Sequence, residues 1–125
     1  MTTVHDLLTP ADPQAIHGLL APDVAFHSPV ADYAGAPDVA HLLAAIGTCV
    51  TDIEVGRQYV DGSHRVTVFS GHVREHAVDA VLIQQTDVDG RLREATLMLR
   101  PLAGLRRAVG LMREALAIDP LPSRA

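Results

Sequence analysis

An aspartate lies inside one of the most apolar stretches of the chain. Asp79 interrupts the run from Ala77 to Ile83, whose aliphatic and β-branched residues are typical of a strand buried on at least one face. An ionised carboxylate there loses its hydration, which is costly unless it is paired or its pKa rises. Asp79 is therefore a candidate general base in a pocket. Structural pairing with a serine, tyrosine or arginine is the alternative.

Three other polar residues could assist Asp79. His27 follows a short apolar segment, and histidine titrates near neutral pH, so an Asp79–His27 pair could abstract a proton from a carbon acid. Tyr33, in the next loop, could polarise a carbonyl group. Arg100 ends an apolar strand and could bind a ligand carboxylate or Asp79 itself. The structural alternatives are a half-buried, hydrogen-bonded histidine, a tyrosine packed on the core, and an arginine paired with Glu94 or a helix end.

Strand alternation extends this candidate site. If Asp79 points inward, Ala77, Val81 and Ile83 share its face and form a mostly apolar wall with one acid. Such a wall is typical of a small-molecule site. The chain has no HxH, HExxH or paired-cysteine pattern, no glycine-rich phosphate loop and no serine nucleophile elbow. We therefore expect neither a metal nor a cofactor.

Composition limits the class of protein. The 125 residues suit a single domain, 1–125, and no apolar stretch reaches the roughly 20 residues that cross a bilayer. The first residues do not resemble a signal peptide, and a single cysteine allows no internal disulfide, so we expect a cytoplasmic protein. A formal charge of −5 without a basic stripe argues against a nucleic-acid partner.

The order of elements predicts an α+β fold. Apolar spacing indicates helices from Asp12-Pro13 to about Ala21-Pro22 and from about Pro37-Asp38, with a short strand, residues 24–27, between them. Asp-Gly pairs and a polar turn then separate four antiparallel strands. These strands are expected at residues 51–60, 64–73, 77–86 and 92–100.

A last helix is expected from Gly104, and residues 119–125 are expected to be a frayed tail. The apolar side of this helix should carry Leu105, Ala108, Val109, Met112, Ala115 and Leu116. Its arginines and Glu114 should fall mostly on the other side. The resulting architecture is a cone: a long, curved antiparallel sheet with helices packed on its concave side around a pocket.

Three segments of the chain resemble a known family. Residues 20–30, LAPDVAFHSPV, are similar to the junction of the first helix and strand in the nuclear transport factor 2-like superfamily, and most of all in its SnoaL-like branch. Residues 88–94, VDGRLRE, match a hairpin common in that branch, and residues 98–102, MLRPL, match its strand ending. The resemblance covers about residues 11–116. It implies a cystatin-like α+β barrel and does not by itself fix a reaction.

The resemblance also allows a comparison of catalytic positions. Asp79 falls on the first catalytic aspartate of the superfamily's epoxide hydrolases, but Ala77 replaces their arginine and Leu97 their second aspartate. Ser28 occupies the position of the ketosteroid isomerases' base, and the base of the SnoaL-type cyclases also aligns near Leu97. The chain therefore matches none of these catalytic sets.

Together these observations predict a homodimer that binds a small apolar or cyclic molecule. Asp79 and His27 are the catalytic candidates for proton transfer of an isomerase or cyclase type. The candidate ligand-binding residues are Tyr33, Arg100, Ala77, Val81 and Leu97. The alternative is a non-catalytic ligand carrier, or an interaction module that dimerises through the outer face of its sheet.

Overall fold

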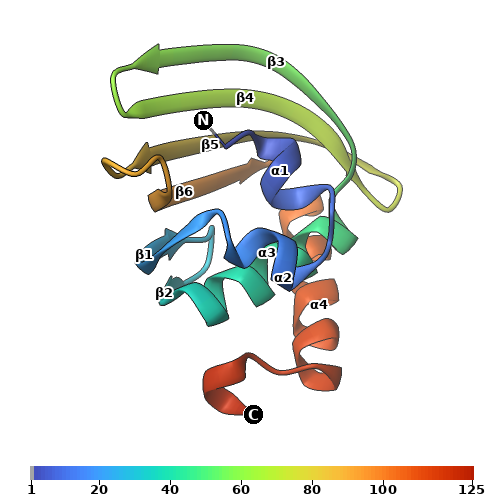
Figure 1. The fold of residues 1–125 in the computed structure, drawn as a ribbon. Helices are drawn as coiled ribbons and strands as arrows, with labels where there is room; N and C mark the ends of the chain where they lie inside the picture. The colour runs from blue at the N-terminus through green and yellow to red at the C-terminus, as the bar shows by residue number, and fades with distance from the viewer. Residues whose placement is uncertain (1) are drawn as a thin grey trace.

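A curved sheet of six strands is the framework of the fold. The computed structural model describes residues 2–125. Figure 1 shows the sheet curving over the helices. The strands are β1 (Leu20–His27), β2 (Asp32–Ala34), β3 (Thr51–Asp61), β4 (His64–Val73), β5 (His76–Thr86) and β6 (Leu92–Arg100). The helices are α1 (Val4–Leu8), α2 (Pro13–His17), α3 (Ala36–Cys49), α4 (Leu102–Ile118) and the short 3₁₀ helix η1 (Pro122–Arg124).

The strand order is β2-β1-β6-β5-β4-β3. The strands from β3 to β6 are antiparallel neighbours, whereas β1 runs parallel to β6 and antiparallel to β2. The sheet ends at β2 and β3, so it is curved but open and does not close into a barrel. This arrangement confirms the predicted α+β fold with a curved sheet. It adds the strand β2, where a loop was expected.

The hairpins follow from their turn residues. Gly62 and Gly90 have positive φ angles of 59° and 81°, which glycine adopts without a steric penalty. The bounds of β4 and β6 are those predicted, and β3 and β5 are each one residue longer. The Asp-Gly signals therefore placed the antiparallel strands correctly.

The first part of the chain differs from the prediction. The helix expected to continue to about Ala21-Pro22 ends at His17, and Leu20 already belongs to β1. The chain also forms α1, where no helix was expected. A capping box between Thr3 and Asp6 starts this helix, which buries three apolar side chains.

The core lies between the concave face of the sheet and the helices. On β5, Val78, Ala80 and Leu82 point into it, whereas Asp79 and Val81 lie on the outer face. Helix α4 packs against β4, β5 and β6, and α3 packs against β1, α1 and α2. Within residues 2–125, no helix is long and apolar enough to cross a membrane.

The last residues are not a frayed tail. Leu121 is buried in the core, although it was assigned to the tail. The amide and hydroxyl of Ser123 both donate hydrogen bonds to the Asp38 carboxylate at the start of α3. These bonds lower the pKa of Asp38. These hydrogen bonds therefore hold the C-terminal residues against the first turn of α3.

Candidate functional site

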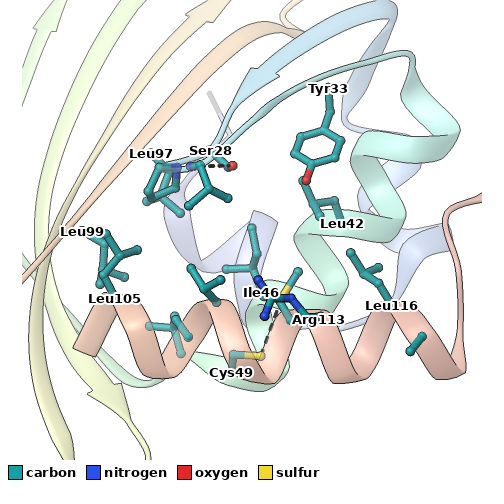
Figure 2. Close-up of a pocket in the computed structure, with 17 residues that line it drawn as sticks. Ser28, Tyr33, Leu42, Ile46, Cys49, Leu97, Leu99, Leu105, Arg113 and Leu116 are labelled. Atoms are coloured by element: carbon teal, nitrogen blue, oxygen red, sulfur yellow. Dashed lines mark hydrogen bonds between the residues drawn. The ribbon is translucent and has the colours of Figure 1, made fainter. Parts of the chain in front are cut away.

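A cavity of about 440 Å³ lies between α3, α4, β6 and the connection from β1 to β2. Its size is within the range of small-molecule sites. Figure 2 shows Ser28 and Tyr33 across the cavity from α4. The lining residues are Ser28, Pro29, Val30, Tyr33, Leu42, Ile46, Cys49, Val50, Leu97, Leu99, Leu105, Ala108, Val109, Met112, Arg113, Leu116 and Ala117.

The apolar character of the cavity follows from the periodicity of the elements around it. Leu97 and Leu99 are two residues apart on β6, so both side chains point to the concave face of the sheet. Leu42, Ile46 and Cys49 are spaced by four and three residues on α3, so they share one face of the helix. Apolar walls from three elements therefore converge on one space.

The lining contains few polar side chains. The Ser28 hydroxyl donates to the carbonyl of Ala31 (2.9 Å) and accepts from its amide (3.0 Å), so it is engaged in the β1–β2 turn. Tyr33 lies on β2, and Figure 2 shows its hydroxyl directed toward Leu42. Tyr33 therefore brings a hydroxyl group to an otherwise apolar wall.

Cys49 is the cysteine of this cavity. Its side chain is buried, and its Sγ lies 3.7 Å from the Sδ of Met112 on α4. Burial raises the pKa of the thiol, which outweighs the opposing hydrogen bond from Thr48. Cys49 is therefore a neutral thiol near pH 7, and it behaves as a small apolar residue of the wall.

Arg113 supplies the one charge in the lining. It belongs to α4, where its side chain is exposed but borders the cavity. An arginine can lay its methylene groups along an apolar surface while its guanidinium stays in water. The cavity is thus apolar inside and has a cation at its edge.

Asp79 does not face this cavity, so the prediction of an inward carboxylate is wrong. Its side chain is 61% exposed and lies on the outer face of the sheet. Arg100, opposite it on β6, donates a hydrogen bond of 3.1 Å from its guanidinium to the Asp79 carboxylate. The structural alternative, pairing of Asp79 with an arginine, is therefore the observed arrangement. Neither Asp79 nor Arg100 lines the cavity.

Ala77 and Val81 share the outer face with Asp79, as the alternation predicted, so they are also outside the cavity. Ala77 and Asp79 border a different hollow on the sheet surface, of about 320 Å³, together with acidic residues of β3. This hollow is more polar and lies on the opposite side of the sheet. The prediction that Ala77, Asp79 and Val81 share one face of β5 is correct. The prediction that this face points toward the cavity is wrong.

His27 also lies away from the cavity lining. Its Nδ1 is 2.7 Å from an oxygen of Asp32 on β2, and its Nε2 is 2.9 Å from an oxygen of Glu94 on β6. These two carboxylates, Glu94 most of all, raise the pKa of His27. The imidazole links three strands and is not near Asp79, so the expected Asp79–His27 pair does not form.

Two of the predicted residues do line the cavity, namely Leu97 and Tyr33. Arg113 was not predicted, because the arginines of this helix were expected to fall mostly on the polar side. Its spacing of four residues from Val109 fits this position, but Arg106, three residues before Val109, fits the same helix face and does not line the cavity. Within residues 2–125, no cluster of histidine, cysteine and acidic side chains is arranged to hold a metal ion.

Comparison with known proteins places this fold in a family. No family model and no curated protein matches the chain. Among solved structures, a steroid delta-isomerase from Pseudomonas aeruginosa is 35% identical, with a TM-score of 0.83 over 91% of this chain and 86% of that one. An uncharacterized protein from Silicibacter pomeroyi with a cystatin-like fold is 22% identical, with a TM-score of 0.87 over 93% of this chain and 84% of that one.

A third structure, an NTF2-like protein of unknown function from Mesorhizobium loti, is 22% identical with a TM-score of 0.67, covering 78% of this chain and 84% of that one. The two structures at 22% identity support the fold alone. The fold is that of the cystatin-like α+β proteins. Together with the 35% identical neighbour, this fold shows that the chain belongs to the nuclear transport factor 2-like superfamily.

Proposed function

We propose that this chain binds a small apolar or cyclic molecule in the cavity between α3, α4 and β6. The observation that carries the proposal is the cavity itself, which has about 440 Å³ of space and a lining that is almost entirely aliphatic. The cavity borders solvent at exposed residues such as Val30 and Arg113, and an apolar ligand would cover its aliphatic walls and remove them from water.

The similarity to a steroid delta-isomerase supports the same class of ligand. Steroids are rigid, cyclic and apolar, and the cavity offers them apolar walls. The hydroxyl of Tyr33 is suited to donate a hydrogen bond to a carbonyl or hydroxyl group of such a molecule. The proposal therefore extends to polycyclic molecules with a polar substituent.

Proton transfer is the second candidate function, and the isomerase neighbour is the observation that favours it. The reaction would need a general base against the ligand. Among the described lining residues the titratable groups are Tyr33, Cys49 and Arg113, and none is a carboxylate. A tyrosine, an arginine and a thiol of raised pKa are poor bases near neutral pH. Binding without turnover is therefore the better-supported function.

A cavity-filling variant tests the binding proposal. Val109 lines the cavity from α4, so Val109→Trp should fill part of its volume and weaken binding of the neutral fluorophore N-phenyl-1-naphthylamine at least about tenfold. Val88, which is fully exposed in a turn, provides the matched control Val88→Trp. Fluorescence titration of both variants decides the proposal. Equal affinity of the two variants would exclude the cavity as the binding site.

Deuterium exchange from the solvent distinguishes binding from catalysis. We expect a steroid ketone incubated with the protein in deuterium oxide to be recovered without added deuterium beyond a protein-free control. Proton transfer by the protein would instead introduce solvent deuterium into the molecule. Deuterium uptake that Val109→Trp abolishes would establish the catalytic alternative.

We also propose that the chain forms a homodimer through the outer face of its sheet. Apolar side chains from β3 to β6 gather on this face, including Tyr59 and Met98, which are more than half exposed. Val81 lies opposite Met98 at the centre of these strands. Val81→Glu should therefore convert a dimer into a folded monomer in analytical ultracentrifugation. A wild-type monomer at all concentrations would contradict the proposal.

A further inference from the structure

Arg113 carries a positive charge at the edge of the cavity. It is the one charged residue among those lining the cavity. Within residues 2–125, no carboxylate forms an ion pair with its guanidinium. Among the arginines in the same part of the chain, only Arg100 pairs with a carboxylate, so Arg113 differs from the other unpaired arginines in its position at the cavity.

The position of Arg113 on α4 puts its exposed side chain at the edge of the cavity. It follows Val109 by four residues and precedes Ala117 by four, and both of these line the cavity. Residues spaced in this way share one face of a helix. Arg106 and Arg107 are also exposed on α4, but neither borders the cavity. Of the arginines of α4, Arg113 is thus the one that borders the ligand space.

The rest of the lining contains nothing that would repel an anion. It includes no aspartate and no glutamate, and Cys49 is held neutral by its burial. Tyr33 and Ser28 lie on the opposite side of the cavity from α4, as Figure 2 shows. The electrostatic character of the cavity is therefore set by one cation at its α4 side.

We propose that the molecule bound in this cavity is an amphipathic acid. Its apolar body fills the space between α3 and β6, and its carboxylate, sulfate or sulfonate group binds the guanidinium of Arg113. A guanidinium can donate two parallel hydrogen bonds to such a group, and the surrounding apolar walls strengthen the charge interaction. This inference rests on the proposed binding function, and it adds the chemical class of the ligand.

Two fluorophores with the same apolar body provide the test. The dye 8-anilinonaphthalene-1-sulfonate carries a sulfonate group, and N-phenyl-1-naphthylamine is the same molecule without it. Each is titrated into the wild-type protein and into Arg113→Gln, which removes the charge. Arg106→Gln, on the same helix but outside the cavity, removes an equal charge and is the matched control.

Arg113→Gln should weaken binding of the sulfonate dye about three- to tenfold, the effect of one partly solvated charge-assisted contact. The affinity for the neutral dye should stay within about twofold, and Arg106→Gln should change neither affinity by more than that. Raising the salt concentration should weaken binding of the sulfonate dye to the wild-type protein and have a smaller effect on its binding to Arg113→Gln.

Three outcomes would overturn the inference. In the first, Arg113→Gln weakens binding of the sulfonate dye no more than Arg106→Gln does. In the second, Arg113→Gln weakens binding of both dyes equally, which would assign to Arg113 a packing role alone. In the third, Arg113→Gln unfolds the protein, as judged by circular dichroism, and the conservative variant Arg113→Lys has no higher affinity for the sulfonate dye than for the neutral dye. If Val109→Trp leaves both dyes bound as in the wild type, it is the binding proposal that fails.

Discussion

The guanidinium of Arg100 donates a hydrogen bond of 3.1 Å to the carboxylate of Asp79, across neighbouring positions of β5 and β6. Both side chains are mostly exposed on the outer face of the sheet. Leu97, three residues before Arg100, lines the cavity on the concave face. The acid that seemed suited to catalysis is therefore separated from the ligand space by the sheet itself.

This geometry predicts that Asp79 has little influence on binding. Asp79→Asn removes one exposed ion pair, so it should change the free energy of unfolding by at most about 1 kcal/mol. The affinity for N-phenyl-1-naphthylamine should equal that of the wild type. Urea denaturation and fluorescence titration measure the two quantities. A large loss of affinity in the folded variant would restore Asp79 to the site.

The His27 ring predicts a pH dependence of stability. Hydrogen bonds to Glu94 and Asp32 raise its pKa above the ordinary 6.5, so the folded protein binds this proton more tightly than the unfolded chain. The stabilisation is complete below the unfolded value and is lost as pH rises through the raised folded pKa. His27→Gln should therefore lower the melting temperature at about pH 5.5 and have a smaller effect at about pH 9.

A control separates this effect from a general one. His17, exposed at the end of α2, forms no ion pair within residues 2–125, so His17→Gln should shift the melting temperature equally at both pH values. If the effect of His27→Gln were the same at both pH values, or larger at the higher pH, the proposed role of the two carboxylates would be wrong.

Cys49 offers a chemical readout of cavity occupancy. Because burial raises the pKa of its thiol, alkylation by N-ethylmaleimide should be slow near neutral pH and accelerate as pH rises. Saturating N-phenyl-1-naphthylamine should slow it further by filling the space beside Cys49. The control moves the cysteine to exposed Val88 in a Cys49→Ser, Val88→Cys protein, whose alkylation the dye should not change. Equal protection in both proteins would contradict a ligand in the cavity.

Two glycines test the packing that supports the cavity. A side chain at Gly47 on α3 would collide with the backbone carbonyl of Leu8 on α1, so Gly47→Ala should cost about 1–3 kcal/mol of unfolding free energy. Gly110 on α4 has open space where its side chain would be, so Gly110→Ala should stabilise the helix by about 0.5–1 kcal/mol. Urea denaturation measures both changes, and the same sign for the two would refute this description of the helix contacts.

The sequence predicted the antiparallel strands well because their signals are local. Glycines at Gly62 and Gly90 provide the positive φ angles that the hairpins require, and alternating apolar residues continue up to each turn. Helix α1 was missed because five residues are too few to display a helical period. Its burial depends on contacts with α3, which lie far along the sequence.

The candidate site was predicted less well for a specific reason. The run from Ala77 to Ile83 is apolar on both faces of its strand, so alternation alone does not determine which face is inside. The register set by the Gly90 hairpin places Asp79 opposite Arg100, and this pairing was recognised as one alternative. Arg113 was missed because an arginine on an amphipathic helix is normally a solvent signal, and its helix face is shared with Arg106, which does not line the cavity.

Methyl NMR with N-phenyl-1-naphthylamine decides which side of the sheet binds the ligand, because the two faces of the sheet carry distinct methyl groups. We expect the dye to shift the signals of Leu97, Leu99 and Val109, which line the cavity. The signals of Val81 and Ile83, on the outer face, should remain in place. Shifts confined to Val81 and Ile83, with the signals of the cavity residues unchanged, would contradict binding in the cavity.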